Sequence, residues 1–125
     1  MTIALVNAFS VNMLNGDNQA VDFAPISGME AREMLENGFL SFIGHESTAT
    51  LLSHRLGIDV DYNRQSYRFM PRDQVILAQY NGPRLHEFAI ELPEGASLNF
   101  WLIQIMRRVA MFRDGNKQFS VHQYR

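Results

Sequence analysis

The segment Ile43-Gly44-His45-Glu46-Ser47-Thr48 combines residue types that can bind a phosphate and transfer a proton. It follows an apolar run at residues 39–43 and precedes an amphipathic helical pattern, so we expect it at a helix N-terminus. Backbone N–H groups and the helix dipole favour an anion there. Gly44 permits close approach of the backbone, and the imidazole of His45 can protonate a leaving oxygen near pH 7. The segment therefore predicts a site where an anion meets a general acid. Ordinary N-capping by Ser47 and Thr48 is the alternative.

The composition excludes several classes of protein and of site. The chain has 125 residues, of which 46% are hydrophobic and 19% charged, as expected of one globular domain. It has no cysteine, which excludes disulfides, thiolate metal sites and a cysteine nucleophile. No apolar run reaches the ~18–20 residues that span a membrane, and no signal-peptide pattern is present, so we expect a cytoplasmic protein without a membrane partner. No metal-binding histidine spacing and no nucleotide-cofactor motif occurs, so no metal or cofactor is expected.

The charges are segregated along the chain. The net charge is −2, yet residues 63–84 carry four arginines against the single acidic residue Asp73. Residues 17–61, in contrast, carry eight acidic residues against Arg32 and Arg55. Arginine suits planar, bidentate contact with phosphate. A basic stripe on a slightly acidic protein favours a defined anionic ligand over bulk duplex DNA. Arginines scattered over the surface are the alternative.

The hydrophobic pattern predicts strands at residues 3–6, 21–26, 66–70, 74–80 and 98–106, with a buried helix as the alternative for the last of these. A capping box of Ser27 and Glu30 opens a helix that should end at Asn37-Gly38. A second helix should begin near His45 or Glu46 and end at Gly57. Residues 59–63 should form a loop, and residues 85–92 have no assignable pattern. These elements predict a small single α/β domain with a mixed β-sheet and flanking helices.

We expect residues 107–125 to be a C-terminal extension of the domain formed by residues 1–106. This extension has five basic residues against one acidic residue, Asp114. Asp114-Gly115-Asn116 is a turn signal, and a strand is expected near residues 119–121.

Polar residues follow two of the predicted strands. Asn7, Ser10 and Asn12 come after the first strand, and the turn Asn81-Gly82-Pro83 delivers Arg84 just beyond another strand. Together with His45 and the other arginines of residues 63–84, they provide one candidate acid, several arginines, and amide and hydroxyl groups, without metal ligands. This set suits metal-free cleavage of an RNA phosphodiester, in which the RNA's own 2′-hydroxyl attacks.

Two motifs together resemble a known family. The octamer Asn7-Ala8-Phe9-Ser10-Val11-Asn12-Met13-Leu14, followed by the hexamer of residues 43–48, is similar to the viral anti-CRISPR ring nucleases. Those enzymes degrade cyclic tetra-adenylate, the second messenger of type III CRISPR defence. Further matches are Asn63-Arg64 before a strand, Gln79 inside the next, and Arg84-Leu85 with Glu87 after it. The matches run in order from residue 3 to about residue 106.

The resemblance implies a symmetric homodimer that binds the cyclic RNA across its axis. His45 would be the general acid that protonates the 5′-oxygen, Arg84 would stabilise phosphate charge, and Glu87 would orient Arg84 or the attacking 2′-hydroxyl. The implied substrate-binding residues are Asn7, Ser10, Asn12, Ser47, Thr48, Arg64 and Gln79. The implied product is linear di-adenylate with a 2′,3′-cyclic phosphate, formed without a metal or cofactor, and no stable duplex DNA partner is expected.

The chain departs from the family pattern at three places. Glu46 replaces an aspartate, Phe88 replaces the glycine that follows the glutamate, and the extension from residue 107 has no counterpart. His86 is either an extra catalytic group or a surface residue. Two alternatives to the enzyme stay open: a protein that sequesters a cyclic nucleotide without cutting it, and a viral DNA-binding protein that uses its arginines.

Overall fold

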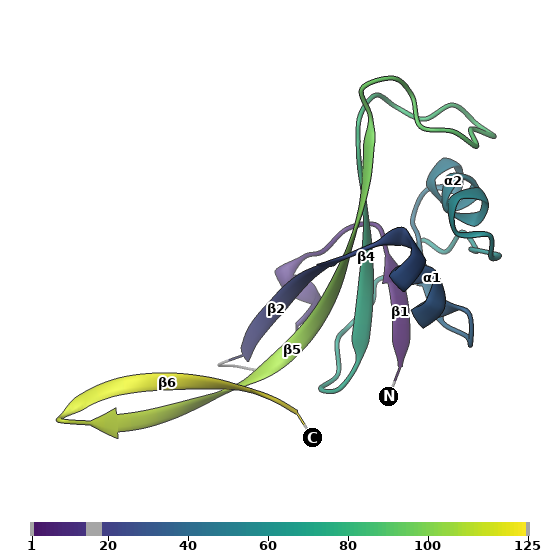
Figure 1. The fold of residues 1–125 in the computed structure, drawn as a ribbon. Helices are drawn as coiled ribbons and strands as arrows, with labels where there is room; N and C mark the ends of the chain where they lie inside the picture. The colour runs from purple at the N-terminus through teal and green to yellow at the C-terminus, as the bar shows by residue number, and fades with distance from the viewer. Residues whose placement is uncertain (1, 15–18, 125) are drawn as a thin grey trace.

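The computed structural model describes residues 2–14 and 19–124, and these residues form one sheet with two helices packed on it (Figure 1). Five strands follow the order β2-β5-β4-β1-β3, and β6 pairs with the far end of β5. Their bounds are β1 (Ile3–Val6), β2 (Gln19–Ile26), β3 (Leu40–Phe42), β4 (Gln74–Asn81), β5 (Ser97–Arg113) and β6 (Asn116–Gln123). The predicted α/β domain with a mixed sheet is confirmed.

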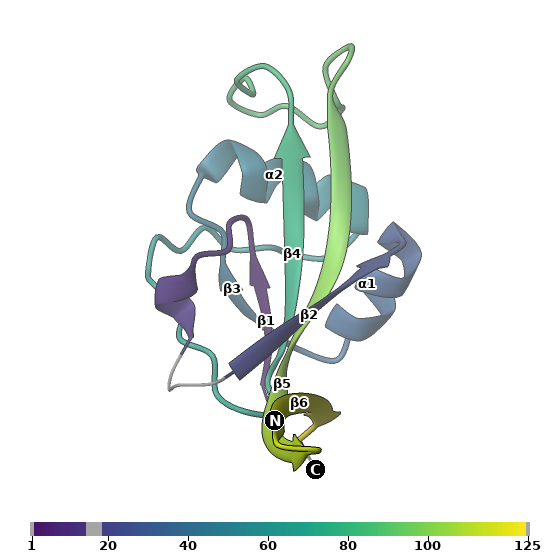
Figure 2. The ribbon, with the colours of Figure 1, turned by 90° about the vertical axis from the view of Figure 1, so that its left-hand side faces the viewer.

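Three neighbouring strands run in the same direction. β1 pairs in parallel with β3, with Ala4 opposite Leu40, and in parallel with β4, with Ile3 opposite Gln74. β5 is antiparallel to both β4 and β2. The carboxyl ends of β1, β3 and β4 therefore meet at one edge of the sheet, here called the carboxyl edge (Figure 2).

The two helices begin and end where local sequence signals predict. α1 (Gly28–Leu35) is opened by the expected capping box, in which the Glu30 N–H donates to Ser27 Oγ and the Ser27 N–H donates to Glu30 Oε1. These bonds lower the pKa of the Glu30 carboxyl. α2 (Glu46–Leu56) ends at Gly57, whose φ of 68° is the left-handed conformation that glycine adopts readily. Within the described residues, neither helix is long and apolar enough to cross a membrane.

A hydrophobic core lies on each face of the sheet. α1 and α2 cover one face, where Leu35 and Leu52 pack with Leu5, Ile76 and Phe100. The opposite face is covered by the connection that contains the 3₁₀-helix η1 (Val11–Met13) and by the segment around residues 67–69. Side chains alternate between these faces because successive strand residues point in opposite directions.

The strand predicted at residues 66–70 is wrong. Tyr67 and Phe69 are buried while their neighbours are exposed, which is the alternation of a strand, but the segment lies against the face of the sheet. The Phe69 N–H donates to the carbonyl oxygen of Met13 in the covering connection. Buried Asp73 accepts hydrogen bonds from the Tyr67 hydroxyl and the Met70 N–H. Burial and the bond to Asp73 raise the pKa of Tyr67. The alternation thus reflects burial of one side only.

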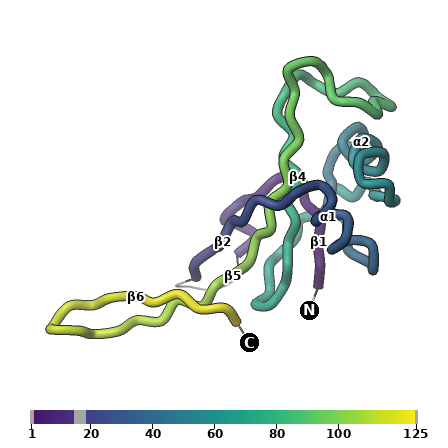
Figure 3. Tube along the Cα trace, in the orientation of Figure 1, coloured from purple at the N-terminus to yellow at the C-terminus, as the bar shows by residue number. Residues whose placement is uncertain are grey.

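The C-terminal extension is a two-stranded ribbon that projects from the sheet (Figure 3). β5 runs without interruption past residue 106, and its last seven residues pair with β6 from Arg107 opposite His122 to Arg113 opposite Asn116. Asp114 and Gly115 connect the strands with φ values of 52° and 76°, the conformation of a tight hairpin turn. The predicted turn and the strand around residues 119–121 are confirmed, and β6 is longer than expected. Residues 107–123 are called the β5–β6 hairpin below.

Candidate functional site

A surface cavity of about 530 Å³ lies at the carboxyl edge of the sheet. Its lining comes from the start of α2, the end of β4 and the loop that follows β4: His45, Glu46, Ser47, Thr48, Tyr80, Arg84, Leu85 and Glu87. His45 follows β3 and Arg84 follows β4, so the parallel order of these strands brings the two side chains to the same edge. The cavity therefore unites all three predicted catalytic residues with Ser47 and Thr48.

His45 occupies the position immediately before α2. Its φ of −133° and ψ of 129° are extended, and its side chain makes no capping hydrogen bond. The cap position belongs to His45, so the alternative in which Ser47 and Thr48 cap the helix is wrong. Thr48 is 7% exposed, whereas the His45 imidazole is exposed and free to meet a ligand.

Asn7 and Arg64 lie next to Gly44, the residue before His45. The Gly44 N–H donates to Asn7 Oδ1 over 3.1 Å, which ties the end of β1 to the residue before His45. A Cβ built on Gly44 would lie 3.8 Å from Arg64 Cγ and 3.9 Å from Asn7 Oδ1. These are ordinary contacts, so packing within the chain does not itself require glycine here.

The segment that carries Arg64 is held along β3. Ile43 and Tyr62 form a parallel bridge, the Asn63 N–H donates to the Ile43 carbonyl over 2.9 Å, and the Asn63 amide donates to the Ser41 carbonyl over 3.0 Å. The expected loop at residues 59–63 is thus pinned to the sheet. This fixes Tyr62 and Arg64 on either side of Asn63.

The turn after β4 is built to deliver Arg84. A Cβ on Gly82 would come within 2.6 Å of the Ala96 Cβ, so glycine is needed there. The Tyr80 hydroxyl donates to the Pro83 carbonyl and closes the turn, and buried Leu85 anchors the chain after Arg84. Arg84 and Glu87 are exposed on either side of this anchor.

A second turn follows at once. The Ala89 N–H donates to the His86 carbonyl over 3.1 Å, and Phe88 inside this turn has a φ of 67°. Glycine or asparagine normally fills such a position. This conformation gives a physical reason for the glycine that the ring-nuclease pattern places after the glutamate.

Three predicted substrate-binding residues lie away from the cavity. Ser10 accepts a hydrogen bond from the Asn12 N–H at the start of η1, and the neighbouring Phe9 and Met13 pack on the face opposite α2. Gln79 accepts a hydrogen bond from the Trp101 indole on that same face. The structure therefore does not bring Ser10, Asn12 and Gln79 together with His45 within one protomer.

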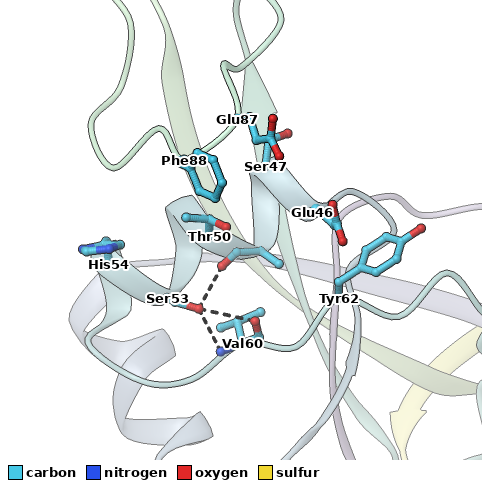
Figure 4. A pocket seen from close by; sticks show the side chains of 10 residues that line it. Glu46, Ser47, Thr50, Ser53, His54, Val60, Tyr62, Glu87 and Phe88 are labelled. Carbon is cyan, nitrogen blue, oxygen red and sulfur yellow. Dashed lines mark hydrogen bonds between the residues drawn. The ribbon is translucent and has the colours of Figure 1, made fainter.

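A second cavity, of about 550 Å³, adjoins the first and was not predicted from the sequence (Figure 4). Glu46, Ser47 and Glu87 line both cavities. The second cavity is otherwise lined by Ala49, Thr50, Ser53, His54, Val60, Tyr62 and Phe88. Two of these, Phe88 and Tyr62, are exposed aromatic residues in segments without a regular pattern, so periodicity gave no signal for them.

Residues 2–14 and 19–124 contain no cluster of possible metal ligands. In these ranges no three histidine, aspartate or glutamate side chains gather as a metal site requires. His86 is exposed and is not part of the lining of either cavity.

Comparison with known proteins places the chain among viral proteins. A model of the STIV B116-like family matches residues 3–99, which is most of the chain. Uncharacterized protein 26 of Sulfolobus islandicus filamentous virus (isolate Iceland/Hveragerdi) is 26% identical over 107 residues, covering 82% of this chain and 90% of that protein.

The structure of B116 of Sulfolobus turreted icosahedral virus superposes with a TM-score of 0.72 at 21% identity. The superposition covers 83% of this chain and 99% of B116. At this level of sequence identity the likeness shows the fold alone. The expected relationship to viral proteins is confirmed at this level. The chain belongs to the STIV B116-like family.

Proposed function

We propose that the protein is a metal-independent ring nuclease that cleaves cyclic oligoadenylate, with cyclic tetra-adenylate as the expected ring. The observation that carries the proposal is the cavity at the carboxyl edge. There a histidine without a capping role faces the same space as an arginine and a glutamate from another strand end. An imidazole, a guanidinium and hydroxyl groups around one exposed cavity suit a phosphodiester.

The chemistry balances without water. The 2′-hydroxyl of one ribose releases its proton to solvent and its oxygen attacks the adjacent phosphorus. A 2′,3′-cyclic phosphate forms, and the bond to the 5′-oxygen of the next nucleotide breaks. His45 donates a proton to that 5′-oxygen, Arg84 neutralises charge on the phosphate, and Glu87 orients Arg84 or the 2′-hydroxyl. Two such cuts convert a ring of four adenylate nucleotides into two linear di-adenylates.

A symmetric homodimer would complete the site. Asn7 and Arg64 lie beside Gly44, the residue before His45, whereas Ser10, Asn12 and Gln79 belong to the other face of the sheet near the carboxyl edge. A ring that crosses this edge between two protomers would meet both groups. In a virus-infected host cell the activity would antagonise type III CRISPR signalling in the cytoplasm, and a related chromosomal protein would reset it.

The test is incubation of the protein with cyclic tetra-adenylate in EDTA, followed by chromatography and mass spectrometry. We expect linear di-adenylate with a 2′,3′-cyclic phosphate, and a dimer in solution by light scattering. Absence of product from this and other ring sizes, while binding is intact, would exclude the enzyme.

The second candidate function is sequestration of the ring without cleavage. It is favoured by Phe88, whose bulky side chain occupies a turn position suited to glycine directly after Glu87. Recovery of intact cyclic RNA from the complex would establish it. Steeply salt-dependent binding of duplex DNA, with no preference for cyclic RNA, would instead support the DNA-binding alternative.

A further inference from the structure

The second cavity is bordered by two aromatic side chains that are open to solvent. Phe88 is 76% exposed and Tyr62 is 46% exposed. In Figure 4 the Phe88 ring lies over α2 near Thr50, and Tyr62 lies beside Glu46 near the start of the helix. Because Glu46, Ser47 and Glu87 line both cavities, one ligand can occupy both.

Phe88 adopts a conformation that its own side chain disfavours. Its φ of 67° lies in the left-handed region, where a bulky residue is rare and costs backbone energy. Burial of the ring does not offset this cost, because most of the ring is in solvent. Strained residues of this kind cluster at ligand sites.

The charges of the two cavities differ. Arg84 and His45 line the first, which suits a phosphate. The carboxylates of Glu46 and Glu87 line both cavities, but no arginine or lysine is among the described residues that line the second. Without an arginine to offset them in the second cavity, these carboxylates disfavour a phosphate there and accept hydrogen bonds from an amino group.

The remaining polar side chains leave a small set of ligand-facing groups. Ser53 Oγ donates to the Ala49 carbonyl over 2.9 Å and accepts from the Val60 N–H over 2.9 Å, so it serves the fold. Thr50 and His54 also line the cavity. The cavity thus combines a flat aromatic surface with acceptors for N–H groups.

We propose that this second cavity is a nucleobase subsite in which Phe88 stacks on an amino-bearing purine, while the attached phosphate lies beside Arg84 and His45. The identification of the purine as adenine rests on the proposed function. The stacking itself follows from the exposed ring, its strained turn and the acidic lining.

The test uses variants that separate the ring from the turn. Phe88→Asn suits the left-handed turn but removes the ring, and Phe88→Tyr keeps the ring in the same turn. Phe112→Ala removes an equally exposed ring (77%) from the hairpin and is the matched control. Two probes are used. The first is cyclic tetra-adenylate, whose binding is measured with variants that also carry His45→Ala. The second is a linear trinucleotide in which 2-aminopurine replaces the central adenine, and its fluorescence falls when the base stacks.

We expect Phe88→Asn to raise the Kd for cyclic tetra-adenylate roughly 10- to 100-fold and to abolish the 2-aminopurine quenching. It should at the same time raise the Tm by roughly 3–6 °C, since the strain is relieved. Phe88→Tyr and Phe112→Ala should bind both probes like the parent protein. Weaker binding together with higher stability is not the result of general damage to the fold.

The outcomes separate this proposal from the proposed function. Unchanged binding of both probes by Phe88→Asn, while wild-type protein still cleaves the ring, overturns the subsite alone. Quenching that depends on Phe88, without binding or cleavage of cyclic tetra-adenylate, retains the subsite and excludes the ring nuclease. If neither probe binds wild-type protein, both proposals fall.

Discussion

The carboxyl edge and the β5–β6 hairpin are built in opposite ways. At the carboxyl edge, residues far apart in the sequence are brought together by three parallel strands with a core on each face. In the hairpin each residue contacts a near neighbour across a tight turn, and Met111, Phe112, Phe119 and Val121 remain exposed. Arg108 and Lys117 lie over the Phe119 ring, at 3.5 and 5.2 Å from its centroid.

The difference indicates where stability and function reside. Residues 3–99, which match the STIV B116-like family, contain both cavities and most of the two cores, and the hairpin lies beyond this range. Replacement of an exposed side chain at the carboxyl edge should cost little stability but, under the proposed function, should affect the ligand. A buried side chain below that edge determines whether the site forms. Replacement of a hairpin side chain should affect neither the ligand nor the formation of the site.

The largest expected effect is on catalysis by His45. His45→Ala should reduce cleavage of cyclic tetra-adenylate by about 10²- to 10⁴-fold, since the 5′-oxygen loses its proton donor. Binding should stay within a few-fold of wild type by calorimetry. His122→Ala, which removes a hairpin histidine whose ring bonds to Ser120 Oγ, is the control and should cleave normally. Equal activity of the two variants would remove His45 from the mechanism.

Two phenylalanines compare the stability of the two regions directly. Phe69 is fully buried, and Phe69→Ala should lower the free energy of unfolding by about 3–5 kcal/mol because a cavity is left in the core. Phe112 is 77% exposed, and Phe112→Ala should change it by less than about 0.5 kcal/mol. Urea denaturation measures both. Similar losses would mean that the hairpin has a packing role the structure does not show.

The hydrogen bond between Tyr67 and Asp73 tests the stability of the core through its dependence on pH. Tyr67→Phe should cost about 1–3 kcal/mol at pH 8, because buried Asp73 loses a donor. The folded-state pKa of Tyr67 lies above its unfolded value near 10. Its contribution is therefore complete below about pH 10 and declines as the pH rises toward the folded pKa. Urea titrations from pH 8 to 11 should show a shallower alkaline loss for Tyr67→Phe, and identical slopes would refute the assignment.

Removal of the hairpin should have the smallest effect. A chain that ends after Arg107 loses the β5–β6 pairing and the packing of Tyr124 on the core, a cost of about 1–2 kcal/mol. Its cleavage rate should stay within about threefold of wild type, because none of residues 107–123 lines either cavity. A large loss of cleavage with an intact fold would show that the hairpin contributes to the site.

Features set by neighbouring residues were predictable from the sequence. The Ser27–Glu30 capping box, the helix end at Gly57 and the Asp114-Gly115 turn each depend on contacts within a few residues. Alternating burial at residues 66–70 predicted a strand, because a segment lying on a sheet and a strand within one share that pattern.

Features set by the topology were not predictable from spacing. His45 and Arg84 share a cavity because β1 lies between β3 and β4 in parallel; in the sequence their chemistry and the resemblance connected them, but their spacing did not. Residues 85–92 have no periodicity, so the Phe88 turn and the second cavity could not be predicted. The helix ends and turns follow from interactions between neighbouring residues, whereas the site follows from the order of the strands in the sheet.

The most direct test of the central claim replaces the leaving oxygen. Cyclic tetra-adenylate with a 5′-bridging sulfur releases a thiolate, which needs no proton donor. If His45 is the general acid, His45→Ala should cleave this analogue in EDTA at nearly the wild-type rate, although it fails on the natural ring. An equally large defect of His45→Ala on both rings, or no cleavage of either ring by wild-type protein, would contradict the account.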